Sequence, residues 1–192
     1  MVLMQIASSY STSLLVAPLS TKAITAAAVA VAGDALAQSA DASIQQYDAI
    51  RGQGFALFGA SYTGVFQHHL FGWLDALTPC GLRGAIECTA INQFLVIPLC
   101  YMPLFLLMSG MFAGRTIRQT LTDAHAKFWP LVKRNWSFWL PVQCALFALA
   151  PQHLLVPLMC LCSVAWNYIL SMAALSAPVP VPVPVVVEMT AA

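Results

Sequence analysis

Residues 135–175 read NWSFWLPVQCALFALAPQHLLVPLMCLCSVAWNYILSMAAL, a stretch without a single Asp, Glu, Lys or Arg. The charge-free run continues to residue 187. As one helix it would be roughly 80 Å long, whereas the hydrocarbon core of a bilayer is about 30 Å thick. The chain must therefore fold back, and 151–153 (Pro-Gln-His) is the predicted break. This leaves a short hydrophobic segment at 136–150 and a full span at 154–175.

The composition of the whole chain agrees with a membrane location. Of its 192 residues, 60% are hydrophobic and 8% are charged, and the mean hydropathy is +0.78. Soluble domains average about 25% charged residues, so this chain cannot cover a soluble surface. An ordinary soluble enzyme and a disordered chain are both excluded. The net charge of +1 gives no reason to expect a nucleic-acid partner, and the lipid bilayer is the predicted surrounding.

Upstream of this stretch, three further apolar runs are long enough to cross a bilayer, at 14–38, 52–77 and 85–112. Residues 78–81 carry a turn signal between the second and third runs. Residues 114–134 differ, because they hold five of the eight basic residues: Arg115, Arg118, Lys127, Lys133 and Arg134. Apolar residues recur there at helical spacing, which predicts an amphipathic helix on the membrane surface, with a solvated loop as the alternative.

We therefore predict an all-α fold, a polytopic transmembrane helical bundle with four main spans, an amphipathic surface helix and a short extra hydrophobic segment. Residues 1–175 form its single domain, and 176–192 form a Pro/Val-rich tail outside the bundle. The bias of Lys and Arg places the loop with residues 115–134 on the inner side of the membrane. If 136–150 also crosses, there are five spans and the C-terminus changes side.

Polar residues within the predicted spans carry most of the functional information, because they are costly in a bilayer. Two interpretations of these residues are open: they converge on a polar path, or they only brace helices through hydrogen bonds. The candidates are Asp34, Gln38, His68, Asn92, Gln93, Gln143, Asn167 and Ser171, with Arg51 placed to neutralise Asp34.

Small and aromatic residues add predictions about packing and about the membrane boundary. Gly64, Gly110 and Gly114 are candidates for close helix contact, the last two as a small-xxx-small pair. Trp136, Trp139 and Trp166 lie near span ends, where indoles commonly anchor a protein at the interface.

No catalytic motif appears among these residues. The six cysteines lie mostly in apolar runs and are interpreted as small hydrophobic residues. There is no nucleophile elbow, phosphate loop or His-x-x-x-His pattern in the sequence. We expect a protein that is not an enzyme and that has no metal and no cofactor.

Several blocks resemble one known family, that of the Mpv17 mitochondrial inner-membrane protein and the twenty-two-kilodalton peroxisomal membrane protein. WSFWLPVQ at 136–143 and WNYILS at 166–171 are similar to its W-x-x-W-P-x-x-Q and W-N-x-Y-L-S patterns. Earlier similarities run through Pro18, Thr21, Gly33-Asp34 and Gln38, then Arg51, Gly59, Gly64 and His68, then Asn92-Gln93 and Pro98. The chain departs from the family at Val65, Leu70-Phe71 and Asn92, where the family has Pro, Trp-Tyr and Asp.

The resemblance implies a four-helix protein of the mitochondrial inner membrane or the peroxisomal membrane. It implies a channel-like or channel-regulating role for small solutes that supports organelle homeostasis. The alternative is a non-conducting scaffold that organises the membrane or a partner complex. The sequence leaves open the solute, the gating and whether the protein forms a homo-oligomer.

Overall fold

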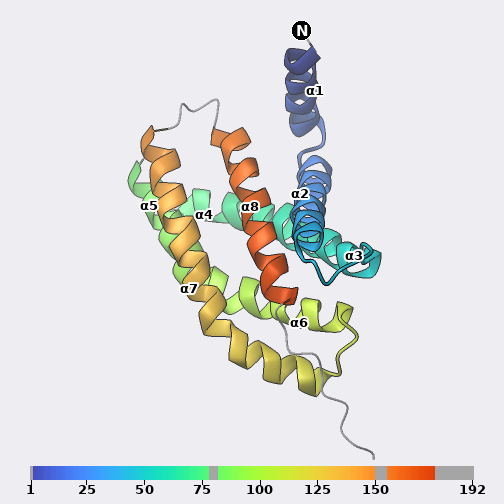
Figure 1. Cartoon of the computed structure of the whole chain (residues 1–192). Coiled ribbons are helices and arrows are strands. Elements are labelled where there is room, and N and C mark those ends of the chain that lie inside the picture. Colours follow the sequence, from blue (N-terminus) through green and yellow to red (C-terminus); the bar gives the residue numbers. More distant parts are fainter. Residues whose placement is uncertain (1, 78–81, 150–154, 176–192) are drawn as a thin grey trace, which may run out of the picture.

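The computed structural model describes residues 2–77, 82–149 and 155–175, and these are helical apart from short connections (Figure 1). In chain order the helices are α1 (Val2–Val16), α2 (Pro18–Ala40), α3 (Ala49–Phe58), η1 (Gly59–Phe66), α4 (Gln67–Leu77), α5 (Leu82–Ile91), η2 (Asn92–Tyr101), α6 (Met102–Phe112), α7 (Ile117–Leu149) and α8 (Leu155–Leu175). The prediction of an all-α fold is confirmed for the described ranges. The predicted turn at 78–81, the break at 151–153 and the tail at 176–192 lie outside them.

The second and third predicted spans appear as two composite helices. α3, η1 and α4 follow one another without a break, and so do α5, η2 and α6. The two η segments are π-helices, in which the backbone N–H bonds five residues back. Gln67 closes η1 on the carbonyl of Tyr62, and Met102 closes η2 on that of Ile97. η2 also contains Pro98, which has no N–H to donate to a regular α-helix.

The helix that corresponds to the first predicted span begins later in the chain than predicted. The run 14–38 is not one helix, because the chain breaks at Ala17 and α2 begins at Pro18. Proline suits the first helical position, where its fixed φ is already helical and its missing N–H costs nothing. The preceding residues form a separate helix, α1, which Figure 1 shows extending beyond the end of α2.

The predicted separation of a surface helix from the hydrophobic segment after it is wrong, as α7 shows. The predicted surface helix at 114–134 and the predicted short segment at 136–150 are not separate elements, because α7 runs from Ile117 to Leu149 as one helix of 33 residues. It opens with a reciprocal cap, in which Gln119 N–H donates to the Thr116 hydroxyl and the Gln119 side chain accepts from Thr116 N–H. Pro130 and Pro141 lie inside it, and Figure 1 shows a bend between its yellow and orange parts. Prolines bend a helix without ending it when neighbouring helices hold the two halves in place.

Two helical stretches of the described chain are long and apolar enough to cross a membrane, Pro18–Ala40 and Ile86–Phe112. A third apolar stretch, Leu161–Ala174, is shorter. The predicted count of four spans is therefore not confirmed.

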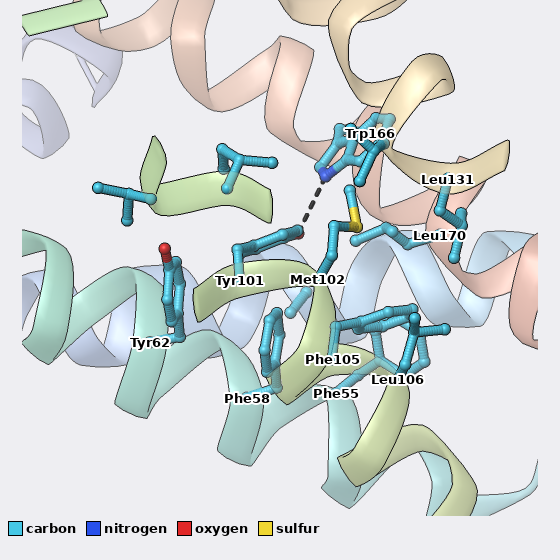
Figure 2. Close-up of a cluster of buried hydrophobic side chains, with 14 residues drawn as sticks. Phe55, Phe58, Tyr62, Tyr101, Met102, Phe105, Leu106, Leu131, Trp166 and Leu170 are labelled. Atoms are coloured by element: carbon cyan, nitrogen blue, oxygen red, sulfur yellow. Dashed lines mark hydrogen bonds between the residues drawn. The ribbon is translucent and has the colours of Figure 1, made fainter. Parts of the chain in front are cut away.

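The core lies where α3 and η1 meet η2, α6 and α8. Aromatic rings pack edge to face there, with Phe58 at 5.2 Å from Tyr101 and 5.4 Å from Phe105 between ring centroids. Trp166 of α8 donates its indole N–H to the hydroxyl of Tyr101 at 3.0 Å (Figure 2). Trp166 is 3% exposed, so its predicted role as an interface anchor is wrong, and it is a core residue.

Candidate functional site

A buried ion pair ties three helices together. Asp34 of α2 is 0% exposed, and its Oδ1 lies 3.1 Å from Nε of Arg51 in α3. The same oxygen accepts from the hydroxyl of Ser171 in α8 at 2.6 Å, and Oδ2 accepts from the Gln38 amide at 2.8 Å. Arg51 also donates to the carbonyl oxygen of Ser171 at 2.9 Å. Each carboxylate oxygen of Asp34 thus has a donor, as a buried charge requires.

The loop between α2 and α3 is held by the same group. The backbone N–H of Asp48 donates to the Gln38 side chain at 2.7 Å, while the Asp48 carboxylate caps α3 by accepting from the N–H groups of Ile50 and Arg51. Tyr47, in this loop, lies against Gly52 of α3. Burial raises the pKa of the Tyr47 hydroxyl, and the negative charge of Asp34 adds to the shift.

Glycines allow the helices around this cluster to approach closely. A Cβ on Gly33 would fall 2.9 Å from the backbone of Asn167 in α8, and one on Gly59 would fall 2.6 Å from the carbonyl oxygen of Ala26 in α2. Gly64, a predicted packing residue, lies directly against Ala23 of α2. α2 is thereby enclosed between η1 and α8 at backbone contact, as small-residue interfaces in membranes permit.

A separate cavity of about 430 Å³ opens beside residues 22–30 of α2. Its volume lies within the range of small-molecule sites. Most of its wall area is apolar, and its lining residues come from α1, α2, η1, α4, η2, α7 and α8. Both π-helices contribute to it, and π-helical turns often occur at functional sites. Its described polar lining residues are Tyr10, Lys22, Thr25, Thr63, Gln67, Asn92, Gln93, Tyr101, Asn135, Gln143, Ser163 and Asn167.

Carboxamides are the main polar feature of this wall. Gln93 donates to the Gln143 side chain at 3.4 Å, and its backbone carbonyl accepts from the indole of Trp136 at 2.8 Å. The carboxamide oxygens of Asn92, Gln93 and Asn135 are buried and have no hydrogen-bond partner among the described residues. Buried acceptors are normally satisfied, so these three oxygens are an unusual feature of the contact between η2 and α7.

The structure thus divides the predicted polar residues into two groups. Asn92, Gln93, Gln143 and Asn167 line the cavity, whereas Asp34, Gln38, Arg51 and Ser171 form the ion-pair cluster and are absent from the cavity's described lining. His68 belongs to neither group, and its Nδ1 lies 2.9 Å from Nζ of Lys22, which links α4 to α2.

Gly110 and Gly114 do not form one packing pair in the structure. Gly110 packs against Thr120 of α7. Gly114 does not share that contact, because it ends the α6 segment with φ +68° and has nothing near its Cβ position. A small-xxx-small pair requires both residues on one helix, and here the second lies beyond the helix end.

Trp136 and Trp139 are partly buried against the core, while the exposed tryptophans are Trp73 and Trp129.

Asn135 is the most buried of the polar cavity residues that the sequence did not identify. It is 1% exposed and lies on α7, four and eight residues before Trp139 and Gln143. This spacing puts all three on one helical stripe, and that signal could have identified it. In the sequence Asn135 directly follows Lys133 and Arg134, so it resembles the end of a charged region more than an interior residue.

A chain of this hydropathy whose described residues are helical, with membrane-length apolar helices and a cavity lined partly by carboxamides, is an α-helical membrane protein. Comparison with known proteins gives its family. The Mpv17 / PMP22 family pattern matches residues 110–171. PXMP2/4 family protein 1 of Dictyostelium discoideum is 30% identical over 176 residues, which cover 87% of this chain and 83% of that protein. The chain belongs to the Mpv17 / PMP22 family.

Two more relatives are similar over much of their length. Peroxisomal membrane protein 2 of Bos taurus is 25% identical over 133 residues, covering 66% of this chain and 67% of that protein. Protein SYM1 of Gibberella zeae is 24% identical over 168 residues, covering 84% of this chain and 93% of that protein. No solved structure matches the chain.

Proposed function

We propose that this protein is a channel-like or channel-regulating protein for small solutes in the peroxisomal or mitochondrial inner membrane. The observation that carries the proposal is the cavity of about 430 Å³ between apolar helices, whose lining includes several Asn and Gln side chains. Polar groups within a membrane bundle are expensive and commonly mark a solute path. The names of the relatives support the organelle, since one is a peroxisomal membrane protein. The proposed role is not enzymatic and uses no cofactor.

The proposed arrangement in the membrane has four crossings. The composite helices 49–77 and 82–112 supply the middle two, α2 the first and α8 the last. The first part of α7 then lies at the membrane surface. Its exposed face combines Ile117, Leu121 and Trp129 with the basic residues Arg118 and Lys133, which suits the interface of an anionic leaflet.

A non-conducting scaffold is the second candidate, and the ion-pair cluster favours it. Asp34, Arg51 and Ser171 lock α2, α3 and α8 without forming part of the described cavity lining. The exposed apolar helix faces suit lipid or a second copy of the chain equally. The molar mass of the detergent-solubilised protein, measured by light scattering, distinguishes a monomer from a homo-oligomer.

Solute permeation through purified, reconstituted protein tests the first candidate against the second. Planar-bilayer conductance and the swelling of proteoliposomes in small osmolytes are the measurements. A channel-like protein increases permeation over protein-free membranes, and Asn135→Leu reduces the increase. Gln53→Leu is the matched control, because Gln53 is an exposed carboxamide of α3 outside the cavity's described lining. Permeation equal to that of protein-free membranes, from correctly folded protein, supports the scaffold.

A further inference from the structure

The opening of the cavity carries a positive charge. Lys22 of α2 is the one side chain in the described lining that is charged at neutral pH, and that lining contains no Asp or Glu. Lys22 is exposed, whereas Ala30, about two turns further along α2, is buried. The charge therefore lies where the cavity opens and not at its closed end. A positive opening without a carboxylate attracts an anion.

The ammonium group of Lys22 is not neutralised by its neighbours. It lies 2.9 Å from Nδ1 of His68, and because an ammonium group can only donate, His68 accepts this bond with an uncharged nitrogen. The three ion pairs among the described residues do not include Lys22. A cation within a membrane helix is costly without a counter-charge, and a bound anion would supply one.

Uncharged donors lie beside this ammonium group. The helix formed by η1 and α4 crosses α2 at this level, since Gly64 packs directly against α2 and His68 contacts Lys22. Thr63 and Gln67 are the chain neighbours of these two contact residues, and both line the cavity. A hydroxyl group and an amide N–H next to an ammonium group are donors for the two oxygens of a carboxylate.

Beyond the opening the wall is largely apolar. Val29, Ile97 and Trp139 are among its lining residues. The cavity follows α2 from Lys22 to Ala30, a helix length of roughly 12 Å. Its volume of about 430 Å³ suits a small molecule and not a two-chain membrane lipid. An inorganic anion would leave the apolar surface uncovered, whereas a carbon chain would cover it and gain by leaving water.

We propose that this cavity is a binding site for amphiphilic monocarboxylates, with the carboxylate on Lys22 and the carbon chain along the apolar wall. Thr63 and Gln67 assist in holding the carboxylate. One charge on the ligand matches the one charge of the lining, and a second carboxylate would have to enter the apolar part of the wall. The inference goes beyond the proposed passage of solutes, because binding does not require conduction.

Equilibrium dialysis of isotope-labelled octanoate against the full chain in detergent, with protein-free micelles as the blank, tests this site. Octanol has the same chain without a charge and octylammonium has the opposite charge, so both should displace the label less than unlabelled octanoate does. Shorter carboxylates should bind about fourfold more weakly for each methylene lost, the factor for burial of one such group. These comparisons use the natural protein and stay informative if a variant fails to fold.

Variants test the role of the charge. Lys22→Gln should weaken octanoate binding about tenfold or more, the factor expected for a lost hydrogen bond between charged groups, and Lys22→Arg should retain binding. Lys133→Gln is the matched control, because Lys133 is an exposed lysine of α7 outside the described lining. It should bind octanoate as the natural protein does.

The possible results separate the binding site from the proposed channel. A protein that binds octanoate but increases no permeation supports this site and not the channel. Octanoate binding equal to that of protein-free micelles overturns the inference and leaves the channel to its own permeation assay. Equal displacement by octanol and octylammonium, or unchanged binding by folded Lys22→Gln protein, overturns the role of Lys22. Displacement by phosphatidylglycerol as strong as that by octanoate assigns the cavity to a membrane lipid and overturns the free carboxylate.

Discussion

Replacing Asp34 by Asn should destabilise the protein strongly, because Arg51 would remain largely buried without its counter-charge. The Arg51 side chain is 15% exposed and Asp34 is 0% exposed. Breaking a buried pair by removing one partner costs about 3–5 kcal/mol. The carboxylate of Asp34 accepts on both of its oxygens, whereas an Asn side chain has one acceptor oxygen and one NH2 donor group. That NH2 group would face either the Gln38 amide or the donors of Arg51 and Ser171. Gln38 cannot simply reverse its amide, since its oxygen accepts from Asp48 N–H.

The assay is reversible unfolding in mixed micelles, followed by tryptophan fluorescence, with the free energy of unfolding compared among variants. Asp34→Asn should lose about 3–5 kcal/mol, and the double variant with Arg51→Met should recover most of this loss, because no charge is then left alone. Glu87→Gln is the matched control. Glu87 also pairs with an arginine, Arg83, but that side chain is 83% exposed, and exposed pairs contribute at most about 1 kcal/mol.

The reasoning is refuted if Asp34→Asn folds with unchanged stability, or if the losses in the double variant simply add. A stable Asp34→Asn protein with altered ion selectivity would place this carboxylate in a conducting path. We expect a loss of stability instead, because Asp34 is absent from the described lining of the cavity.

Three further predictions concern packing, backbone and topology. Gly33→Ala should destabilise by about 1–3 kcal/mol in the same unfolding assay, since its Cβ would meet the backbone of α8, and Gly72→Ala, with open space around it, should not. Gly114→Ala should cost about 1–2 kcal/mol because its φ of +68° strains an alanine, and an Asn there should cost less than Ala. A cysteine at Thr122, in a chain without its six native cysteines, should react with an impermeant thiol reagent from the inner side, and reaction from the outer side alone would contradict the proposed topology.

Much of the fold followed from local features of the sequence. The loss of charge after Arg134 and the apolar runs indicated a helical membrane protein, because burial in lipid requires helices with few charges. The composite helices at 49–77 and 82–112 agree with the predicted runs. Helix boundaries were less predictable: Pro18 begins a helix where the hydropathy shows no change, and α7 continues through Pro130 and Pro141. Hydropathy reports the surroundings of a segment, whereas its ends depend on caps and neighbours.

The polar residues were identifiable from the sequence, but their separation into two sites was not. Any ionisable or amide side chain in an apolar run is conspicuous, so Asp34, Asn92 and Gln143 could be selected one by one. Which of them meet depends on the tertiary packing: Ser171 donates to Asp34 across 137 residues of chain, while Gln93 and Gln143 meet between η2 and α7. Helical spacing assigns a residue to a face of its own helix, but only the packing of α2, α7 and α8 determines what that face contacts. For this reason the sequence alone predicted a membrane bundle with polar interior residues, and the tertiary structure distinguished the ion-pair cluster from the cavity.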